Sequence, residues 1–519
     1  MLAALPSELR AQPGPPIGTF FTVNSDSGSH DNPGDQSVVV FTGTVQVPGT
    51  AFIRIFFSEA TLPPGSSLRL TSVLDGAEQD LDAASVAEWE FSSAFFNGPA
   101  VQIELIAGPH TTGNRYVVNQ AFASQPFIET LTICGPTDDR VPLNHPAVAR
   151  MMPGGCTASI YAPGGCMLSA GHCDAPNNMV EFNVPPSLPS GTIQHPPPSD
   201  QYMIDPASRV SEQVPPPCSS LGDDWFHFRC LPNTQTGLLP IQAQHAYIPL
   251  ATSIPMPFPQ PLTIYGYGVD DGVNNQVEQR GDGPLVNFIM VPGSCYPSLR
   301  HQVDTTGGNS GSPIIESRAG RTIGIHTHSG CGGPNDSNGG TPITFPTLQA
   351  ALTCKLLVFS YPYGAVTQIN PAGGATLHVA IEQVVGTLQT GSPQLHVSVG
   401  GEAFSTSALV PSGSEYLGFL PAGTCSGSLT YYISAATTDG TLFTDPYPAP
   451  ASLYTAVCTS GDVNLDGHVS LIDYAALAGC LSGPGVDQPQ IECMAFRFDT
   501  DEDVDLRDVR AFLNAFTGP

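Results

Sequence analysis

The run DTTGGNSGSPI, Asp304 to Ile314, places three glycines, an asparagine and two serines directly before an apolar segment. Glycine and asparagine are common turn residues, so a simple hairpin turn is one interpretation. The other is a reactive serine with backbone amides gathered around it. Serine is a poor nucleophile unless a base removes its proton and an acid orients that base. The choice therefore depends on whether the chain supplies such partners for Ser310.

Candidate partners lie upstream, at the ends of apolar runs. The run CMLSAGHC offers His172, and GDDWFHF offers Asp223 and Asp224 directly before an aromatic run. A serine, a histidine and an aspartate are the residue types of a nucleophile, its general base and an orienting carboxylate. A lone histidine or aspartate is more often a surface or structural residue, and the residues alone leave both aspartates open.

Together, the three runs resemble the catalytic boxes of chymotrypsin-like serine peptidases: SAGHC the histidine box, DDWFHF the aspartate box and GGNSGSP the serine box. The resemblance implies His172 as general base, Asp224 as its orienting carboxylate and Ser310 as nucleophile. It favours Asp224 over Asp223 because the family's aspartate directly precedes apolar strand residues. It also implies an oxyanion hole from the amides of Gly308 and Ser310, two antiparallel barrels with the site in the cleft between them, and no cofactor for catalysis.

Other motifs resemble the bacterial glutamyl endopeptidase branch of that family. Many family members have an aspartate before the nucleophile, which pairs with a newly freed amino terminus; the neutral Asn309 predicts that this switch is absent or weaker. TDDRVPLNHPAVARMM, through Asp138, Asp139 and Arg140, resembles the start of that branch's catalytic domain, and TIGIHTHSG its specificity strand. The resemblance implies cleavage after Glu or Asp, with the acidic side chain received by Thr305, His326, His328 and Ser329. The alternative for His328 is an orientation toward solvent.

Acidic residues near the C-terminus have the spacing of a calcium loop. In DVNLDGHVSLID, the first, third, fifth and twelfth positions are Asp462, Asn464, Asp466 and Asp473, and Gly467 is at the sixth. Oxygen ligands at alternate positions converge on one ion when a glycine allows a sharp turn. The run therefore predicts a structural calcium site.

A second acidic run, FDTDEDVDLRD, is less regular. It places Asp499, Asp501, Asp503 and Asp508 at the third, fifth, seventh and twelfth positions, but Arg497 at the first. A solvated acidic loop without an ion is the alternative. The two loops together resemble a dockerin type I domain, which implies a cohesin-like scaffold partner.

The chain is strongly acidic, with 16 Lys and Arg against 45 Asp and Glu and a net charge of −29. Nucleic acids and anionic membrane surfaces are bound through basic clusters, so we expect neither as a partner. No apolar run has membrane-spanning length. The apolar stretch of MLAALPSELRAQPGPP is too short to predict a signal peptide.

Thirteen cysteines indicate an oxidising compartment, and hence a secreted or cell-surface protein. An odd number leaves at least one of them without a partner in the chain. Proximity in sequence predicts three disulfides, the first of which the peptidase resemblance also implies: Cys156 with Cys173, Cys218 with Cys230, and Cys480 with Cys493. Cys425 and Cys458 are a further candidate pair.

The pattern of apolar residues divides the chain into four segments and predicts a mainly β protein with a small α-helical C-terminal domain. Residues 17–130 and 359–457 alternate in short runs between turn clusters, which is typical of β-sandwiches. Residues 131–358 carry the peptidase motifs and are expected to form the double barrel. Residues 458–519 contain two runs of helical spacing, LIDYAALAGCL and LRDVRAFLNAF. In the first segment, Trp89 is expected in the core rather than stacked on a sugar.

Two hypotheses follow. The first is a secreted serine endopeptidase that acts on proteins or peptides and is tethered by a dockerin-like module. The second is a noncatalytic surface adhesin or scaffold component that uses the barrel as a binding module. The three triad residue types in the expected order favour the first. The N-terminal sandwich could be a pro-domain, a binding module or a packing partner.

Overall fold

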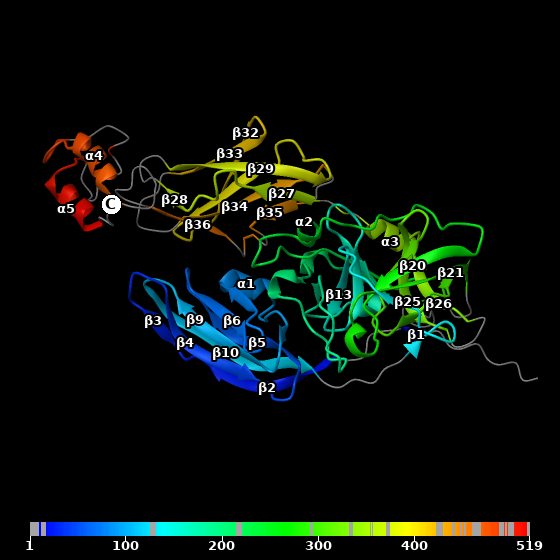
Figure 1. The fold of residues 1–519 in the computed structure, drawn as a ribbon. Coiled ribbons are helices and arrows are strands. Elements are labelled where there is room, and N and C mark those ends of the chain that lie inside the picture. Colours follow the sequence, from blue (N-terminus) through cyan, green and yellow to red (C-terminus); the bar gives the residue numbers. More distant parts are fainter. Residues whose placement is uncertain are drawn as a thin grey trace, which may run out of the picture. The chain divides into compact units, whose positions relative to one another are not determined.

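The structure is a computed structural model that describes residues 10–11, 17–124, 131–213, 221–290, 294–331, 336–352, 354, 356–369, 374–421, 429–438, 442–446, 449–450, 453–458, 469–486, 493, 496 and 503–515. The chain forms two compact units, Met1–Cys354 and Lys355–Pro519. Within the described ranges, no helix combines the length and apolar character needed to cross a bilayer. The architecture is mainly β (Figure 1).

The first unit begins with a sandwich of two antiparallel sheets (Figure 1). One sheet contains β2 (Gly18–Asp26), β3 (His30–Asn32), β5 (Phe52–Thr61), β8 (Phe96–Asn97) and β10 (Thr111–Ser124). The other contains β4 (Val38–Gln46), β6 (Ser67–Ser72), β7 (Glu78–Leu81) and β9 (Ala100–Ala107). Alternation along β9 buries Val101, Ile103 and Leu105 completely, as the two-residue period of a half-buried strand requires. Trp89, just after α1 (Ala83–Glu88), is only 2% exposed, so its predicted place in the core is confirmed.

The rest of the first unit contains two larger sheets. The seven-stranded sheet consists of β13 (Val148–Met152), β14 (Cys156–Ile160), β15 (Met167–Ser169), β16 (Met179–Glu181), β17 (Gln201–Met203), β18 (Val210–Glu212) and β19 (Trp225–Phe228). The second sheet closes on itself through β20 (Gln260–Gly266), β21 (Gln279–Ile289), β22 (Ser298–His301), β26 (Asn338–Pro342), β25 (Arg321–Ser329) and β24 (Pro313–Glu316). Closure of this barrel comes from the pairing of β25 with β26. Two short strands, β1 (Arg10–Ala11) and β12 (Val141–Pro142), pair with β25 and β21.

The N-terminal sandwich packs tightly against the seven-stranded sheet. The buried guanidinium of Arg54 on β5 donates to the carbonyl of Asn177 at 2.9 Å. The backbone of Phe95 exchanges two hydrogen bonds, both 2.8 Å, with the side-chain amide of Gln201. Nε1 of Trp89 donates to Thr234 at 3.2 Å. Because these polar groups are matched across a buried surface, the sandwich serves as a packing partner of the sheet.

The second unit contains another pair of sheets and two helices. One sheet is built from β27 (Leu356–Ser360), β29 (Ala375–Val385), β32 (Val410–Ser412) and β33 (Glu415–Leu420). The other is built from β28 (Gln368–Ile369), β30 (Gln394–Val399), β31 (Ser405–Ala408), β34 (Leu429–Ala436), β35 (Leu442–Asp445) and β36 (Tyr454–Cys458). The predicted helices are confirmed as α4 (Leu471–Cys480) and α5 (Leu506–Ala515).

Candidate active site

Strand pairing brings the histidine and aspartate boxes together. β15 and β19 are antiparallel neighbours with Ser169 opposite Phe226. The residues that follow β15 therefore lie beside the residues that precede β19. His172 is in a 3-10 turn, Gly171–Cys173, just after β15, and Asp224 directly precedes β19.

His172 lies between Asp224 and Ser310. Its Nδ1 is 2.6 Å from Oδ2 of Asp224, and its Nε2 is 2.8 Å from Oγ of Ser310. Asp224 and Ser310 are fully buried, and the His172 side chain is 7% exposed. An aspartate carboxylate only accepts hydrogen bonds, so the proton of the imidazole belongs on Nδ1 and the Nε2 lone pair faces the serine hydroxyl.

Several contacts fix the Asp224 carboxylate. Its Oδ1 accepts from the amide of His172 at 2.9 Å, and Thr341 donates its hydroxyl to the Asp224 carbonyl at 2.8 Å. Gly171 has to be glycine, because a Cβ there would lie 2.2 Å from the carbonyl oxygen of Glu212. Asp223, the alternative acid, makes no hydrogen bond to His172: both its carboxylate oxygens are buried without a hydrogen-bond partner among the described residues.

Ser310 lies on the turn between β23 (Thr305–Thr306) and β24. Gly308 has φ +99°, and a Cβ there would lie 2.4 Å from the carbonyl oxygen of Tyr267. Both observations exclude a side chain at that position. The side-chain oxygen of Asn309 accepts from the Thr306 amide at 2.9 Å, and the carbonyl of Ser310 accepts from the Thr157 amide at 2.8 Å. The turn is thus fastened to β14 of the other sheet.

A buried histidine pair lies beside this turn. The carbonyl of His326 on β25 accepts from the amide of Gly311 at 2.8 Å, and its Nδ1 is 3.1 Å from Nε2 of His301 at the end of β22. Burial, followed by the neighbouring histidines 301, 328 and 172, holds the pKa of His326 well below its usual value. Burial and Arg300 lower the pKa of His301 to about 3. Both imidazoles are therefore neutral near pH 7.

Sequence reasoning did not find His301. Its signal was its place in SLRHQ, at the end of a strand three residues before Asp304. Such a position becomes informative only once β22 is known to lie beside β26, which in turn pairs with β25.

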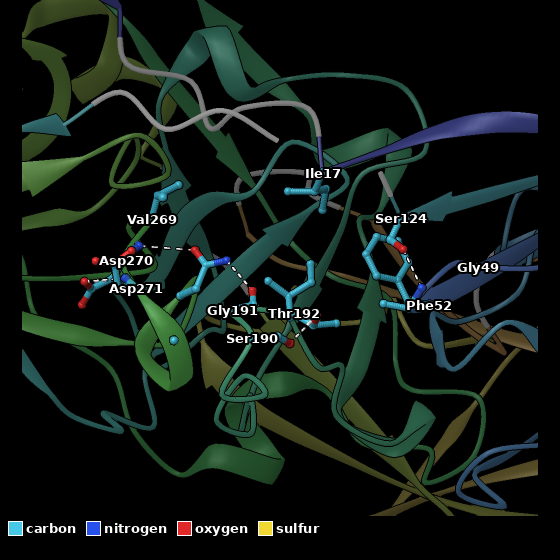
Figure 2. Close-up of a pocket in the computed structure, with 14 residues that line it drawn as sticks. Ile17, Gly49, Phe52, Ser124, Ser190, Gly191, Thr192, Val269, Asp270 and Asp271 are labelled. Carbon is cyan, nitrogen blue, oxygen red and sulfur yellow. Dashed lines mark hydrogen bonds between the residues drawn. The ribbon is translucent and has the colours of Figure 1, made fainter. Parts of the chain in front are cut away.

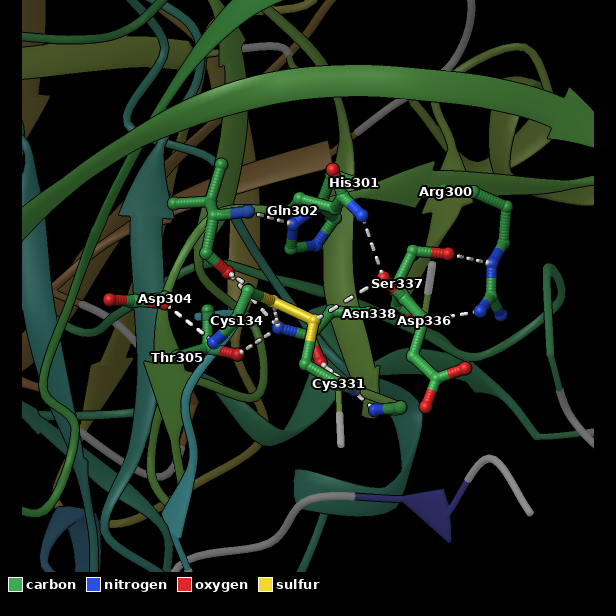
Figure 3. Close-up of a disulfide and its surroundings, with 12 residues drawn as sticks. Cys134, Arg300, His301, Gln302, Asp304, Thr305, Cys331, Asp336, Ser337 and Asn338 are labelled. Atoms are coloured by element: carbon green, nitrogen blue, oxygen red, sulfur yellow. Dashed lines mark hydrogen bonds between the residues drawn. A yellow bond between two sulfur atoms is a disulfide. The ribbon is translucent and has the colours of Figure 1, made fainter. Parts of the chain in front are cut away.

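Thr305 is oriented by a network around a disulfide (Figure 3). Its Oγ1 accepts from the side-chain amide of Asn338 at 2.9 Å, and the same amide donates to the carbonyl of Val303 at 3.0 Å. The Asn338 side-chain oxygen accepts from the amides of Gly330 and Cys331. Cys331 is bonded to Cys134. Asn338 and this disulfide therefore connect Thr305 to the end of β25. Neither of them was predicted from the sequence.

The other two predicted pocket residues follow along β25. His328 is 2% exposed, with Nδ1 2.8 Å from Oγ1 of Thr327, so the alternative of a solvent-facing His328 is wrong. Ser329 is partly buried. Ala11 and Arg10 of β1 lie opposite His328 and Ser329 in antiparallel register.

The cysteines only partly match the prediction. The disulfides Cys156–Cys173 and Cys480–Cys493 are present, and Cys166–Cys354 joins them. The predicted pairing of Cys218 with Cys230 is wrong, because Cys230 is a buried free thiol; Cys218 itself lies outside the described residues. The sulfur of Cys230 instead packs 3.7 Å from the Met167 sulfur. Cys425 is also outside the described ranges.

A pocket of about 490 Å³ lies elsewhere in the first unit, between the N-terminal sandwich, loop 190–193 of the seven-stranded sheet and loop 269–275 between β20 and β21 (Figure 2). Its lining includes Phe52, Ser124, Thr192, Asp270 and Asp271. No triad or predicted specificity residue lines it. The pocket is therefore separate from the candidate active site.

The acidic tail is described in part. Asp462, Asn464, Asp466 and Gly467 of the first predicted loop, and Asp499 and Asp501 of the second, lie outside the described residues. Oδ2 of Asp473, fully buried in the first turn of α4, accepts from the amide of Ser470 at 2.9 Å. Oxygen atoms of the buried Asp503, Asp505 and Asp508 lie within 4.8 Å of one another. Asp505 was not predicted, although it occupies the ninth position of the second loop, which calcium loops also use.

Comparisons with known proteins add the following. No protein-family model and no curated protein matches the chain. Among solved structures, a thermostable serine protease AL20 from an extremophilic microorganism is 17% identical, with 38% of this chain and 91% of that chain covered and a TM-score of 0.28. The protease Anisep from Arthrobacter nicotinovorans is 16% identical, with coverages of 39% and 90% and a TM-score of 0.29. The secreted serine protease VesC from Vibrio cholerae is 11% identical, with coverages of 66% and 75% and a TM-score of 0.28. At these scores the functional conclusion has to rest on the geometry of the site.

Proposed function

We propose that this chain is a chymotrypsin-like serine endopeptidase. The observation that carries the proposal is the continuous hydrogen-bonded arrangement of Asp224, His172 and Ser310, with separations of 2.6 and 2.8 Å. Nucleophile, base and orienting acid come from three distant parts of the sequence and meet in the relation that serine catalysis requires. The disulfides fit an extracellular enzyme.

In the proposed reaction, Nε2 of His172 takes the proton from Ser310 as Oγ attacks the scissile carbonyl carbon. Asp224 holds the Nδ1 proton and stabilises the imidazolium that forms. His172 then gives its proton to the leaving amine, which leaves an acyl-enzyme on Ser310. Water then attacks the ester carbonyl while His172 takes its proton. His172 returns this proton to Oγ as the carboxylic acid product leaves, so Ser310 and His172 are regenerated.

The developing oxyanion requires donors that are in place before the reaction. We assign this role to the amides of Gly308 and Ser310. The positive φ of Gly308 supports the assignment, as do the carbonyl oxygens of Tyr267 and Gly155, which would lie 2.4 and 2.8 Å from a Cβ at this position and so leave no room for a side chain. A bulkier residue at 308 would displace the turn that presents Ser310.

A preference for Glu, or Asp, before the scissile bond is the finer part of the proposal. His326 is neutral and buried, and its Nδ1 lies 3.1 Å from Nε2 of His301. A substrate carboxylate that reaches His326 would raise its pKa, because an opposite charge favours the protonated imidazole. Thr305, oriented by Asn338, would supply a hydroxyl. His328 and Ser329 flank this position along β25.

Two measurements test the proposal at its two levels. A fluorophosphonate probe should label the wild type and fail to label Ser310→Ala; labelling of both would refute the assigned nucleophile, and labelling of neither would favour the noncatalytic adhesin alternative.

Peptides with Glu, Asp, Gln, Arg or Phe before a chromogenic leaving group then test specificity at neutral pH. We expect His326→Ala to reduce Glu turnover far more than Gln turnover. A preference for Arg or Phe would overturn the specificity while leaving the mechanism intact.

For the tail we propose a calcium-stabilised, dockerin-like module that docks to a cohesin-like scaffold. The clustering of Asp503, Asp505 and Asp508 supports the calcium part, because three buried carboxylates fit a hard divalent cation. Calcium titration followed by thermal melting should raise the melting temperature of the wild type, and raise that of Asp508→Asn by less, because this variant keeps only the first loop intact. An unchanged melting temperature in the wild type would refute the calcium part.

A further inference from the structure

The segment that precedes the seven-stranded sheet is fastened to the run that leads to Ser310. β11 (Leu131–Thr132) pairs with β23, with Leu131 opposite Thr306. The carboxylate of Asp304 accepts from the amides of Cys134 at 2.6 Å and Asp139 at 3.1 Å. The segment therefore holds the stretch 304–306 by backbone pairing and by hydrogen bonds to the Asp304 carboxylate.

Arg140 is the charged centre of this arrangement. Its side chain is 1% exposed, and Nη2 lies 2.6 Å from Oδ2 of Asp138. Nη1 donates to Oγ1 of Thr306 at 2.8 Å, and Nη2 to the carbonyl of Val269 at 3.0 Å. Burial alone would raise the pKa of Asp138, but the hydrogen bond and charge of Arg140 outweigh it and keep that pKa below its usual value. The guanidinium is held in three directions.

Thr306 transmits this contact to the nucleophile. Its amide donates to the Asn309 side-chain oxygen at 2.9 Å, and its carbonyl accepts from the Asn309 amide at 3.0 Å. Gly268 allows the close approach: a Cβ there would lie 2.3 Å from both Nη1 of Arg140 and Oδ1 of Asn309. Arg140 and the residue before Ser310 thus lie against the same glycine.

We propose that Arg140, held by Asp138, is a positioning residue that sets the geometry of the Ser310 turn through Thr306 and Asn309. The inference rests on the proposed peptidase function. Its cation is built into the chain, so the turn is ordered without a newly cut amino terminus. Loss of the guanidinium would let the turn shift, and a displacement of about 1 Å can cost about 100-fold in rate.

The test compares Arg140→Met with Arg280→Met. Arg280 is a matched control because it also pairs with an aspartate two residues away, Asp282 at 2.8 Å, but 45% and 53% of the two side chains are exposed. We expect Arg140→Met to lower kcat about 100-fold with KM changed less than about threefold, whereas Arg280→Met stays within about twofold of wild type. Rates are normalised to the folded fraction from circular dichroism.

Rescue separates positioning from folding. Millimolar guanidinium added to Arg140→Ala should restore part of kcat, and Arg140→Lys should fall between wild type and Arg140→Met, because an ammonium cannot reproduce the fork of contacts. A kcat of folded Arg140→Met within about threefold of wild type would overturn the inference. Failure of the wild type to react with a fluorophosphonate would instead refute the proposed function itself.

A second inference rests on β1. β24 pairs with β25 as far as Pro313 and Ile325, and β26 pairs with the opposite edge of β25, where Gly339 lies opposite His328. Since His328 also pairs with Ala11, β1 must lie on the other edge, the one that faces the Ser310 turn through the Gly311–His326 hydrogen bond. An extended peptide that reaches Ser310 by strand addition would need this edge.

We infer that the chain's own segment Arg10–Ala11 occupies the peptide-docking edge of β25 and so competes there with extended peptide substrates. This inference also rests on the proposed function. The double variant Arg10→Pro with Ala11→Pro removes both strand amides in the full-length chain.

We expect this double variant to show at least about tenfold higher kcat/KM on extended peptides, with a smaller gain on a single-residue ester that needs no strand pairing. The control carries prolines at Ala3 and Ala4, outside β1. Unchanged kcat/KM in the double variant, with wild-type and variant Ser310 labelled by the fluorophosphonate at the same rate, would overturn the inference. A variant and wild type that both fail to label would refute the peptidase function.

Discussion

Among the described residues of the first unit, two buried histidine–carboxylate pairs have the same separation between Nδ1 and a carboxylate oxygen. Nδ1 of His172 lies 2.6 Å from Asp224, and Nδ1 of His195 lies 2.6 Å from Oε1 of Glu181. The difference is in what surrounds each pair. Nε2 of His172 faces the Ser310 hydroxyl, whereas Nε2 of His195 is buried with no hydrogen-bond partner among the described residues.

The second pair is surrounded by a cation and by aromatic rings. Arg150 donates to the Glu181 carboxylate at 2.9 Å, and the His195 ring stacks on Phe95 and meets the edge of Phe52, both at 4.6 Å between centroids. Burial lowers the pKa of His195, although Glu181 opposes it. Burial would raise the pKa of Glu181, but His195 and Arg150 more than offset it. A histidine–carboxylate pair therefore becomes a catalytic candidate through the group on its other nitrogen.

The largest expected effect distinguishes the two pairs by activity. Asp224→Asn should lower kcat by about 10⁴-fold, because the amide would favour the wrong tautomer of His172. Glu181→Gln makes the same chemical change in the other pair and should leave kcat within about threefold of wild type once rates are referred to folded protein. Steady-state assays on a Glu-containing peptide measure both; similar losses in the two variants would contradict the assignment of roles.

The pair of His195 and Glu181 should instead contribute to the free energy of unfolding. Glu181→Gln leaves the fully buried Arg150 without its counter-charge, which should cost about 3–5 kcal/mol of unfolding free energy. Urea unfolding followed by tryptophan fluorescence reports on this unit, because both tryptophans, Trp89 and Trp225, are buried in it. Arg69→Met, which breaks an exposed pair with Asp80, is the control and should cost less than about 1 kcal/mol. A Glu181→Gln cost as small as that of the control would contradict the structural role.

The sequence predicted the parts of the site that carry a chemical signature and missed those that depend on three-dimensional proximity. His172, Asp224 and Ser310 could be found because their residue types and their positions beside apolar runs are informative. His301 and Asn338 could not, since each matters only through a partner on another strand. Cys230 shows the same limit in reverse: proximity in sequence to Cys218 suggested a disulfide, but the thiol packs beside Met167.

The fold was predictable where apolar and polar residues alternate regularly along a strand or where apolar residues recur at helical spacing. The short runs of β6 and β9 alternate cleanly, and the two tail helices have clear spacing. The close packing of the N-terminal sandwich against the seven-stranded sheet was not predictable, because its hydrogen bonds come from single polar residues such as Gln201 and Arg54, which carry no pattern of their own.

A third carboxyl group, Asp223, sharpens the comparison because it is buried with neither a base nor a cation. Burial, then the charges of Asp224 and Glu212, raise its pKa to about 6 from 3.8. The folded state therefore holds this proton more tightly than the unfolded state, and the stabilisation, present below about pH 4, is lost as the pH rises through about 6. Asp223→Asn should be more stable than wild type at pH 8 by up to about 3 kcal/mol, with a smaller difference at pH 5. Urea unfolding at both pH values measures this, and a pH-independent difference would contradict it.

The smallest expected effect tests whether an aromatic ring stabilises the buried His195, as measured by the free energy of unfolding in urea. Phe95→Leu retains an apolar side chain but removes the ring stacked on His195 with an interplanar angle of 9°. The loss of this stacking should cost about 1 kcal/mol beyond the change in buried area. Since neither the Glu181–Arg150 pair nor the Ser310 turn is altered, kcat should stay at the wild-type value. Phe122→Leu is a matched control, because Phe122 also contacts Phe52 and Phe95 without stacking on the imidazole. Equal costs in the two variants would show that the ring stabilises the core in general rather than the buried histidine in particular.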